Sequence, residues 1–243
     1  MRLIKHHDGV PYAFHVTRRR HQQRIVMRPS RPGEFRLTVP KRTSRRLIEA
    51  VIEENIDRLL AMPMPTYPAE FEAGDTISLF GKPLTVLVGK GASPVSGVKQ
   101  VVVPPDIDTS RYIRRVLTDA LNEAVTQLVK RHEGCVRRRS LGSLRFTVRP
   151  MKSKFGSCRP DTGRVTLNLE LAHYPEPFLE MIFLHEIAHL DYPNHQEGFY
   201  GLMDKLSPNH RSLRKQLNRL RHALLYEGFA GLLTALKDGE RHD

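Results

Sequence analysis

The stretch His185-Glu186-Ile187-Ala188-His189 holds the side chains best suited to chemistry in this chain. Four residues of an α-helix turn through about 400°, so His185 and His189 are expected on one helix face, one turn apart. Two imidazoles in that arrangement can bind one cation at Zn–N distances of about 2.0–2.1 Å. Glu186 lies beside them, where zinc hydrolases place the general base that acts on metal-activated water. The motif therefore predicts a catalytic metal site.

A third histidine, His195, follows ten residues after His185. Some zinc peptidases place their third ligand at this spacing. Those sequences have glycine at the eighth position of the motif, where the chain turns sharply, whereas this chain has Tyr192. The dipeptide Pro193-Asn194 would have to make the turn instead.

The alternative third ligand is a carboxylate from a later helix, for which Glu197 and Glu227 are the candidates. A fourth coordination position would be left to water, whose proton the glutamate of the motif would accept. We therefore predict one catalytic residue, Glu186, and three ligands for one zinc ion per chain: His185, His189 and His195.

Other polar residues near the motif have less specific roles. A lone cysteine far from the histidines, as Cys158 is, more often packs as a small hydrophobe than binds a metal. His173 is interpreted as a loop histidine. Four side chains could stabilise an oxyanion opposite the metal, and the sequence does not rank them: Tyr192, Asn194, Tyr200 and His210.

The motif belongs to a predicted helix over about 176–191, with Pro175 and Pro177 in its first turn. Polar and apolar residues alternate over 164–171, which predicts a half-buried strand just before this helix. Such a strand could offer an open edge to an extended peptide. The alternative is an ordinary strand inside a sheet.

Hydrophobic periodicity predicts the remaining elements. Strands are expected at 24–27, 35–39, 76–80, 84–88, 98–103 and 144–149, and helices at 44–61, 110–131, 195–206 and 209–226. Because strands and helices are segregated rather than alternating, the predicted fold class is α+β. We expect three regions: a basic N-terminal arm over 1–20, a β-rich subdomain over 21–109, and a metal-binding catalytic region over 110–243.

The composition limits the location of the protein. No stretch approaches the roughly 18 consecutive apolar residues that a membrane span requires, and the first residues lack the apolar core of a signal peptide. The 243 residues include only two cysteines, too few for a disulfide framework. We therefore expect a cytoplasmic protein with no membrane partner.

The net charge of +13 is unevenly distributed. Residues 1–46 and 130–164 are strongly basic, whereas 165–204 hold seven acidic residues and no lysine or arginine. A divalent cation would thus lie in the segment that is free of competing positive charge. The basic segments, and the basic amphipathic helix over 209–226, are suited to nucleic acid, another polyanion or an acidic substrate. The alternative is that the charge only confers solubility.

Several of these segments together resemble the YgjP-like metallopeptidase family, which is related to the SprT-like proteins. The resemblance rests on Lys154-Phe155-Gly156-Ser157-Cys158, Leu167-Asn168-Leu169, the histidine motif, Asn194-His195 and Phe199-Tyr200, and it covers about nine-tenths of the chain. It implies a zincin-like catalytic half with zinc bound by the three histidines and a catalytic glutamate at position 186. Phe155 and Tyr200 stand where that family usually or often has tryptophan, so substrate preference is expected to differ more than metal binding.

Three hypotheses follow. The first is a zinc-dependent metallopeptidase that acts on a peptide or protein. The second keeps the metal chemistry but takes a phosphorylated small molecule such as a nucleotide. The third is a nucleic-acid-binding protein with a structural metal, which would require a fourth protein ligand and would give Glu186 no role.

Overall fold

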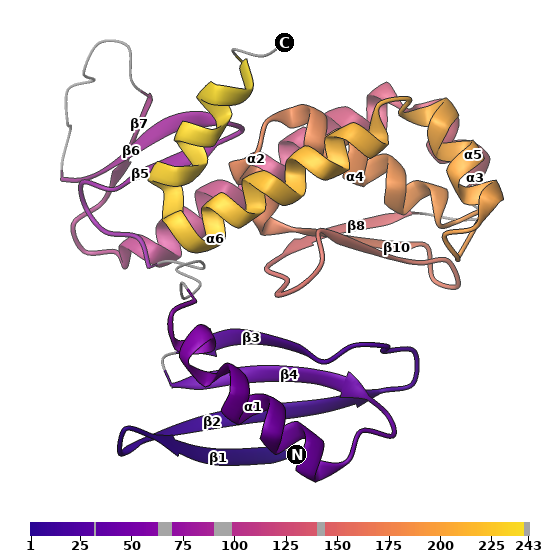
Figure 1. Cartoon of the computed structure of the whole chain (residues 1–243). Helices are drawn as coiled ribbons and strands as arrows, with labels where there is room; N and C mark the ends of the chain where they lie inside the picture. The colour runs from indigo at the N-terminus through magenta and orange to yellow at the C-terminus, as the bar shows by residue number, and fades with distance from the viewer. Residues whose placement is uncertain (32, 63–69, 90–98, 140–143, 241–243) are drawn as a thin grey trace. The chain divides into compact units, whose positions relative to one another are not determined.

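The computed structural model describes residues 1–31, 33–62, 70–89, 99–139 and 144–240. Its contacts divide the chain into two compact units, Met1–Tyr67 and Pro68–Asp243 (Figure 1). The division lies well before residue 110, so the strands over 76–103 belong to the same unit as the histidine motif rather than to the N-terminal subdomain. The predicted α+β class is confirmed, since three small sheets occur together with several helices.

The first unit consists of one sheet and one helix. Its elements are β1 (Arg2–His7), β2 (Val10–Arg19), β3 (Val26–Arg31), β4 (Glu34–Pro40) and α1 (Arg45–Leu60). The strand order is β1-β2-β4-β3, in which β2 and β4 are parallel and the outer pairs are antiparallel. The hydroxyl of Ser44 accepts a hydrogen bond from the backbone of Leu47 at 3.2 Å, which caps the start of α1.

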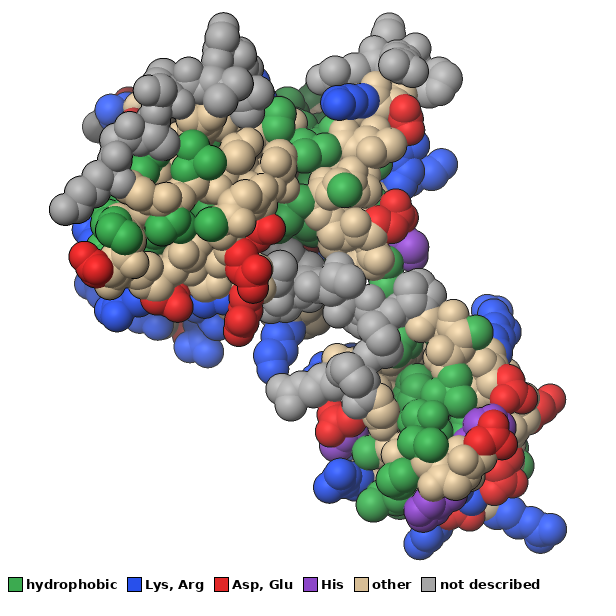
Figure 2. All heavy atoms as spheres, turned by 90° about the vertical axis from the view of Figure 1, so that its left-hand side faces the viewer, with side chains coloured by type: hydrophobic (Ala, Val, Ile, Leu, Met, Phe, Trp, Pro, Cys, Tyr) green, Lys and Arg blue, Asp and Glu red, His purple; other side chains and the backbone are tan. Residues whose placement is uncertain are grey.

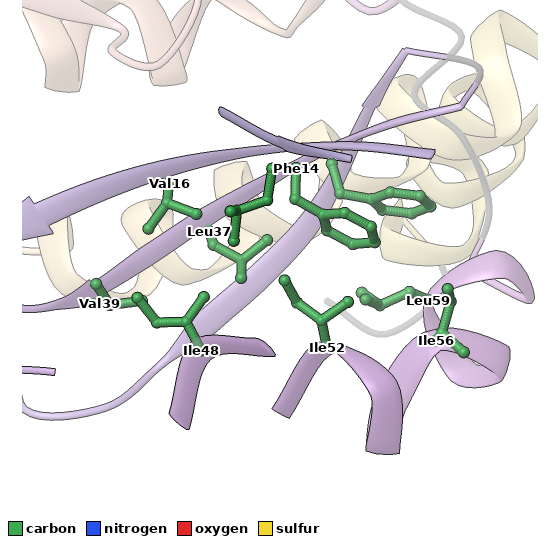
Figure 3. Packing of buried hydrophobic residues seen from close by; sticks show 10 residues of the cluster. Phe14, Val16, Leu37, Val39, Ile48, Ile52, Ile56 and Leu59 are labelled. Carbon is green, nitrogen blue, oxygen red and sulfur yellow. The ribbon is translucent and has the colours of Figure 1, made fainter. Parts of the chain in front are cut away.

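Buried apolar side chains fill the space between this sheet and α1. They are Phe14, Val16, Leu37 and Val39 from the strands, and Ile48, Ile52, Ile56 and Leu59 from α1 (Figure 3). The prediction of an irregular arm over 1–20 is wrong, because β1 and β2 form a hairpin that turns at Asp8 and Gly9, both at positive φ. These strands do contain apolar residues, but the partners against which those residues pack lie in α1 and β4.

The second unit begins with a sheet in the order β5-β6-β7. Its strands are β5 (Thr76–Leu79), β6 (Lys82–Val88) and β7 (Lys99–Val103). The sheet is joined to the segment before the histidine motif through Ser78, whose hydroxyl donates to the His173 carbonyl at 2.6 Å while the His173 ring bonds the Ser78 carbonyl at 2.7 Å. His173 is therefore fully buried, contrary to its interpretation as a loop histidine.

A second three-stranded sheet lies next to the motif. It contains β8 (Arg145–Arg149), β9 (Gly156–Arg159) and β10 (Arg164–Asn168) in the order β8-β10-β9. Of the two alternatives for 164–171, the strand inside a sheet is confirmed and the open edge is wrong: β10 is the central strand, parallel to β8 and antiparallel to β9. The chain then forms a 3₁₀ turn, η1 (Leu169–His173). The edge strands are β8 and β9, and β9 is too short and too poor in β-branched residues to be recognised from sequence.

The helices of this unit are α2 (Thr109–Arg131), α3 (Glu133–Arg139), α4 (Glu176–Ala188), α5 (Glu197–Leu206) and α6 (His210–Glu240). Helix α4 is apolar on nearly all sides and buried, and α6 packs against both α4 and β5 (Figure 1). Gly228, at φ 68°, bends α6 and divides it into two helical stretches. Among the described residues, no helix has the length and apolar character that crossing a bilayer would require.

Candidate metal centre

The three predicted ligand histidines come together at the end of α4 and in the loop that follows. His185 lies in the last turn of α4, His189 caps it, and His195 stands just before α5. Their ligand-capable nitrogens all lie within 4.8 Å of one another. The ring centroids are 4.7–5.0 Å apart in each of the three pairs. Within the described part of the chain, this group includes neither Glu197 nor Glu227, the alternative third ligands.

The loop between α4 and α5 turns without the glycine that related motifs use. The backbone N–H of Tyr192 donates to the Ala188 carbonyl at 3.0 Å, which closes the first turn after the helix. The Tyr192 ring then packs on Gly198, where an added Cβ would lie only 2.6 Å from the ring. A side chain at position 198 would therefore displace the Tyr192 ring from this packing.

Phe199 forms a floor beneath the three imidazoles. Its ring centroid lies 4.9 Å from that of His185 and 4.7 Å from those of His189 and His195. The side chain is only 1% exposed, so it holds the three rings close together on a dry surface. In the sequence, Phe199 stood out only as part of the family resemblance.

The nitrogen positions fit a divalent ion. The Nε2 atoms of His185 and His195 lie 3.0 Å apart, close to the separation of about 3.3 Å expected for two imidazole ligands on one tetrahedral zinc ion. The carbonyl of Tyr192 lies 3.0 Å from Nδ1 of His189, so this nitrogen donates to the carbonyl and Nε2 is the atom available to a metal.

Two of the histidines, His185 and His195, are held in the neutral form that binds metals. Burial, followed by the charges of His189 and His195, lowers the pKa of His185 to about 3. Desolvation and the charges of His189 and Arg214 also lower the pKa of His195. At neutral pH both rings therefore present lone pairs rather than a positive charge.

Glu186 lies on the buried side of the same helix turn and is 5% exposed. Burial raises the pKa of its carboxyl to about 7, against the opposing effects of Lys154, Arg214 and a hydrogen bond from the backbone of Cys158. A carboxyl group with a pKa near 7 can both accept and release a proton at neutral pH.

Gly156, the first residue of β9, lies directly against this carboxylate. A Cβ placed there would be 2.6 Å from Oε1 of Glu186 and 2.8 Å from its Cγ. No side chain fits between the edge strand and the carboxylate, so glycine allows β9 to approach it. The edge of a sheet and a buried acid thus meet in the helix turn that carries His185.

Comparison with known families agrees with this geometry. The model of the YgjP-like metallopeptidase domain matches residues 23–220. The chain belongs to the YgjP-like metallopeptidase family. None of the curated proteins matches it. Among solved structures, the metallopeptidase zymogen of Pyrococcus abyssi abylysin is 20% identical over 38% of this chain and 90% of its own, with a TM-score of 0.35.

In this member of the YgjP-like family, a buried polar network holds the segment that leads to Gly156. The side chain of Asn168 accepts from the backbone of Met151 at 3.0 Å and donates to the carbonyls of Met151 and Lys154 at 2.9 and 2.8 Å. The backbone N–H of Asn168 donates to the Phe155 carbonyl at 2.8 Å. One asparagine therefore fixes the path of residues 151–155.

The network continues to α6 through an ion pair that the sequence analysis missed. The guanidinium of Arg221 lies 2.9 Å (Nε) and 3.0 Å (Nη2) from the carboxylate oxygens of Glu170, and the Tyr174 hydroxyl donates to the same carboxylate at 2.7 Å. Arg221 also lies 4.6 Å above the Phe155 ring. An acid between two leucines in Leu169-Glu170-Leu171 was the only sequence signal for this pair.

Two further cations reach the site from distant segments. Arg214 of α6 lies 5.4 Å above the Phe155 ring and, with Lys154, is close enough to Glu186 to favour its ionised form. Part of the Arg214 side chain is exposed to solvent, while burial lowers the pKa of its guanidinium. The acidic segment that holds the histidines is therefore not free of positive charge in the folded protein, contrary to what the charge pattern suggested.

The candidate oxyanion residues differ in their positions. Tyr200 lies closest to the histidines in an accessible place, with its ring 6.4 Å from that of His195 and 40% of its surface exposed. His210 stacks on Tyr200 and bonds Asp204 at 2.9 Å, so it supports that tyrosine from behind. Tyr192 is 43% exposed and packs on Gly198.

Cys158 is not in the metal-capable group of the described residues. Burial, followed by the charges of Glu186 and Asp161, raises the pKa of its thiol to about 11. The thiol is therefore protonated at neutral pH and poorly suited to bind a metal.

Proposed function

We propose that this protein is a zinc-dependent metallopeptidase in which His185, His189 and His195 hold one zinc ion and Glu186 is the general base. The observation that carries the proposal is the convergence of three imidazoles beside a buried carboxylate. Membership of the YgjP-like metallopeptidase family supports a metal and a peptide substrate. The identity of the metal as zinc rests on the all-imidazole donor set.

When bound, zinc would supply a Lewis acid that lowers the pKa of water to about 7. The chain itself contributes a carboxyl group whose pKa is close to the value that zinc would give to water. Glu186, with its carboxyl pKa of about 7, accepts the proton of the attacking water and passes it to the leaving amine. Phe199 and the buried part of α4 keep bulk water away from one side of this exchange.

The edge strand β9 is our proposed docking site for the peptide. One side of β9 pairs with β10, and no described strand pairs with its other side. An extended peptide can add to such an edge through main-chain hydrogen bonds. Since Gly156 brings β9 against the Glu186 carboxylate, a peptide on this edge would lie beside the proposed base.

Hydrolysis of a phosphorylated small molecule is the second candidate, favoured by Arg214 and Lys154 beside the site. A structural metal is less well supported, because the metal-capable group among the described residues has three members and no fourth protein ligand. A cytoplasmic location stays a prediction from the cysteine content.

The test compares Glu186→Gln with Glu176→Gln, an exposed glutamate in the first turn of the same helix. We expect wild type and both variants to bind about one zinc ion per chain. Only Glu186→Gln should lose hydrolysis of casein, by at least about 100-fold, because general-base catalysis contributes that much or more.

Nucleotides are assayed in parallel with casein. Turnover of nucleotides but not casein would replace the peptidase with the second candidate. Full activity of Glu186→Gln would remove Glu186 from the mechanism, and a wild-type protein that stays metal-free in excess zinc would end the proposal.

A further inference from the structure

Four side chains of the first unit form a row across its sheet. The register pairs Arg2 of β1 with His15 of β2, His15 with Arg36 of β4, and Arg36 with Arg28 of β3. We call these four residues the basic row. Because neighbouring strands lie about 4.8 Å apart, the row is about 14 Å long.

The basic row lies on the face of the sheet opposite α1. Successive side chains of a strand point to opposite faces. His15 lies between the buried Phe14 and Val16, and Arg36 lies between the buried Phe35 and Leu37, all of which pack toward α1. Arg2 and Arg28 occupy the same register as these two residues. The three arginines are exposed to solvent.

The charges of the row are not neutralised by neighbours. Between described residues, none of the ion pairs or side-chain hydrogen bonds involves Arg2, Arg28 or Arg36. The single acid on this face is Glu34, which lies 3.6 Å from the His15 ring.

The acids of the unit gather on the other side. Residues 1–62 contain six acids against 14 lysines and arginines, and four of the six are on α1. Three of these four form ion pairs: Glu49 with Arg45, Glu53 with Lys5, and Asp57 with His7. One side of the unit in Figure 2 shows acidic side chains gathered beside histidines. The unit therefore carries most of its acids on α1, where three arginines accompany them, and exposed arginines on the opposite face of the sheet.

Apart from the half-buried imidazole of His15, the row carries no aromatic side chain. Residues 1–62 contain three phenylalanine or tyrosine rings, and they contact one another on the α1 side: Tyr12, Phe14 and Phe35. Proteins that bind single strands through their bases use aromatic platforms. A row of guanidinium groups without such a platform is suited to phosphates instead, because each guanidinium can donate two hydrogen bonds to one phosphate.

We propose that the basic row binds the phosphate backbone of duplex nucleic acid, without reading its sequence. The duplex carries one negative charge per about 1.7 Å of its axis. This high density of phosphates suits a row of three arginines. This surface is built from residues of the first unit alone. Its function is independent of the hydrolysis proposed above.

The test measures the affinity of the full-length protein for a 20-base-pair duplex as the salt concentration is raised. Three phosphate contacts predict a slope of log K against log salt of about −2.7. The double variant Arg28→Gln/Arg36→Gln should reduce the slope by about 1.8 and weaken binding at 50 mM salt on the order of 100-fold. Its control is Arg46→Gln/Arg58→Gln, which removes the same charge from exposed positions on α1 and should leave both quantities unchanged.

Thermal melting of all variants checks that each is folded, and casein hydrolysis checks the second unit. Equal losses in both double variants would mean that only net charge matters and would overturn the proposal. So would absence of duplex binding at 50 mM salt, a preference for single strands of particular sequence, or binding to phosphatidylserine vesicles in place of the duplex.

Discussion

Replacing Gly156 by alanine tests the packing of β9 against the proposed base. The new Cβ would lie 2.6, 2.8 and 2.9 Å from Oε1, Cγ and Cδ of Glu186. Ordinary contacts between such atoms are about 3.5–4.0 Å, so the carboxylate or the strand must move by about 1 Å. A misplacement of about 1 Å costs on the order of 100-fold in rate, or about 2.7 kcal/mol of transition-state stabilisation. We expect kcat to fall by that factor while about one zinc ion per chain is retained.

The assay combines kcat and KM on a peptide substrate with metal content and thermal melting. Gly201→Ala in α5 is the matched control, because a Cβ there meets no atom within 4 Å. It should keep wild-type kcat and melt slightly higher, since alanine favours a helix by up to about 1 kcal/mol over glycine. Wild-type kcat in Gly156→Ala would refute the reasoning. Loss of zinc together with activity would show that the strand positions the histidines rather than the carboxylate.

Three more predictions concern buried or partly buried charges. Arg214→Gln should raise the pKa of the Glu186 carboxyl, so the acidic limb of the kcat/KM profile should move to higher pH; an unchanged limb would mean that Arg214 does not act on Glu186. Arg221→Met should lower the free energy of unfolding, measured in urea titrations, by about 3–5 kcal/mol, because it leaves the carboxylate of Glu170 buried without its cation. The double variant Arg221→Met/Glu170→Leu should recover part of this loss. Burial lowers the pKa of His173 to about 4 from an ordinary value of 6.5. Relative to His173→Gln, the free energy of unfolding of the wild type should therefore fall by about 3 kcal/mol as the pH falls from 6.5 to 4. A difference between the two proteins that does not change with pH would contradict this.

The surroundings of Glu186 come from three separate parts of the chain. Gly156 and the Cys158 backbone belong to β9, Lys154 to the segment before it, and Arg214 to α6. Burial raises the carboxyl pKa, and the two cations together with the backbone hydrogen bond lower it. A pKa near 7 is thus a balance among groups that meet only after folding, which no local pattern around the motif could predict.

The sequence by itself determined the features that depend on local geometry. The four-residue spacing of His185 and His189 places them on one face of a helix, and the periodicity of the flanking segments located α1, α2, α4 and α5 to within a few residues. The position of His195 near them followed from a short loop of limited reach. The family was also accessible from the motifs alone, as the match over residues 23–220 confirms.

Only the tertiary structure decided the order of strands and the partners of charged residues. Strand order depends on pairing between segments far apart in the chain. The sequence therefore could not decide whether β10 lies at an edge or inside a sheet, and it wrongly predicted an arm in place of β1 and β2. The pair of Glu170 with Arg221 joins residues 51 positions apart, and the basic row joins four strands, so no short-range pattern records either one. Local propensities act over a few residues, whereas burial and charge pairing depend on contacts between segments that are far apart in the chain.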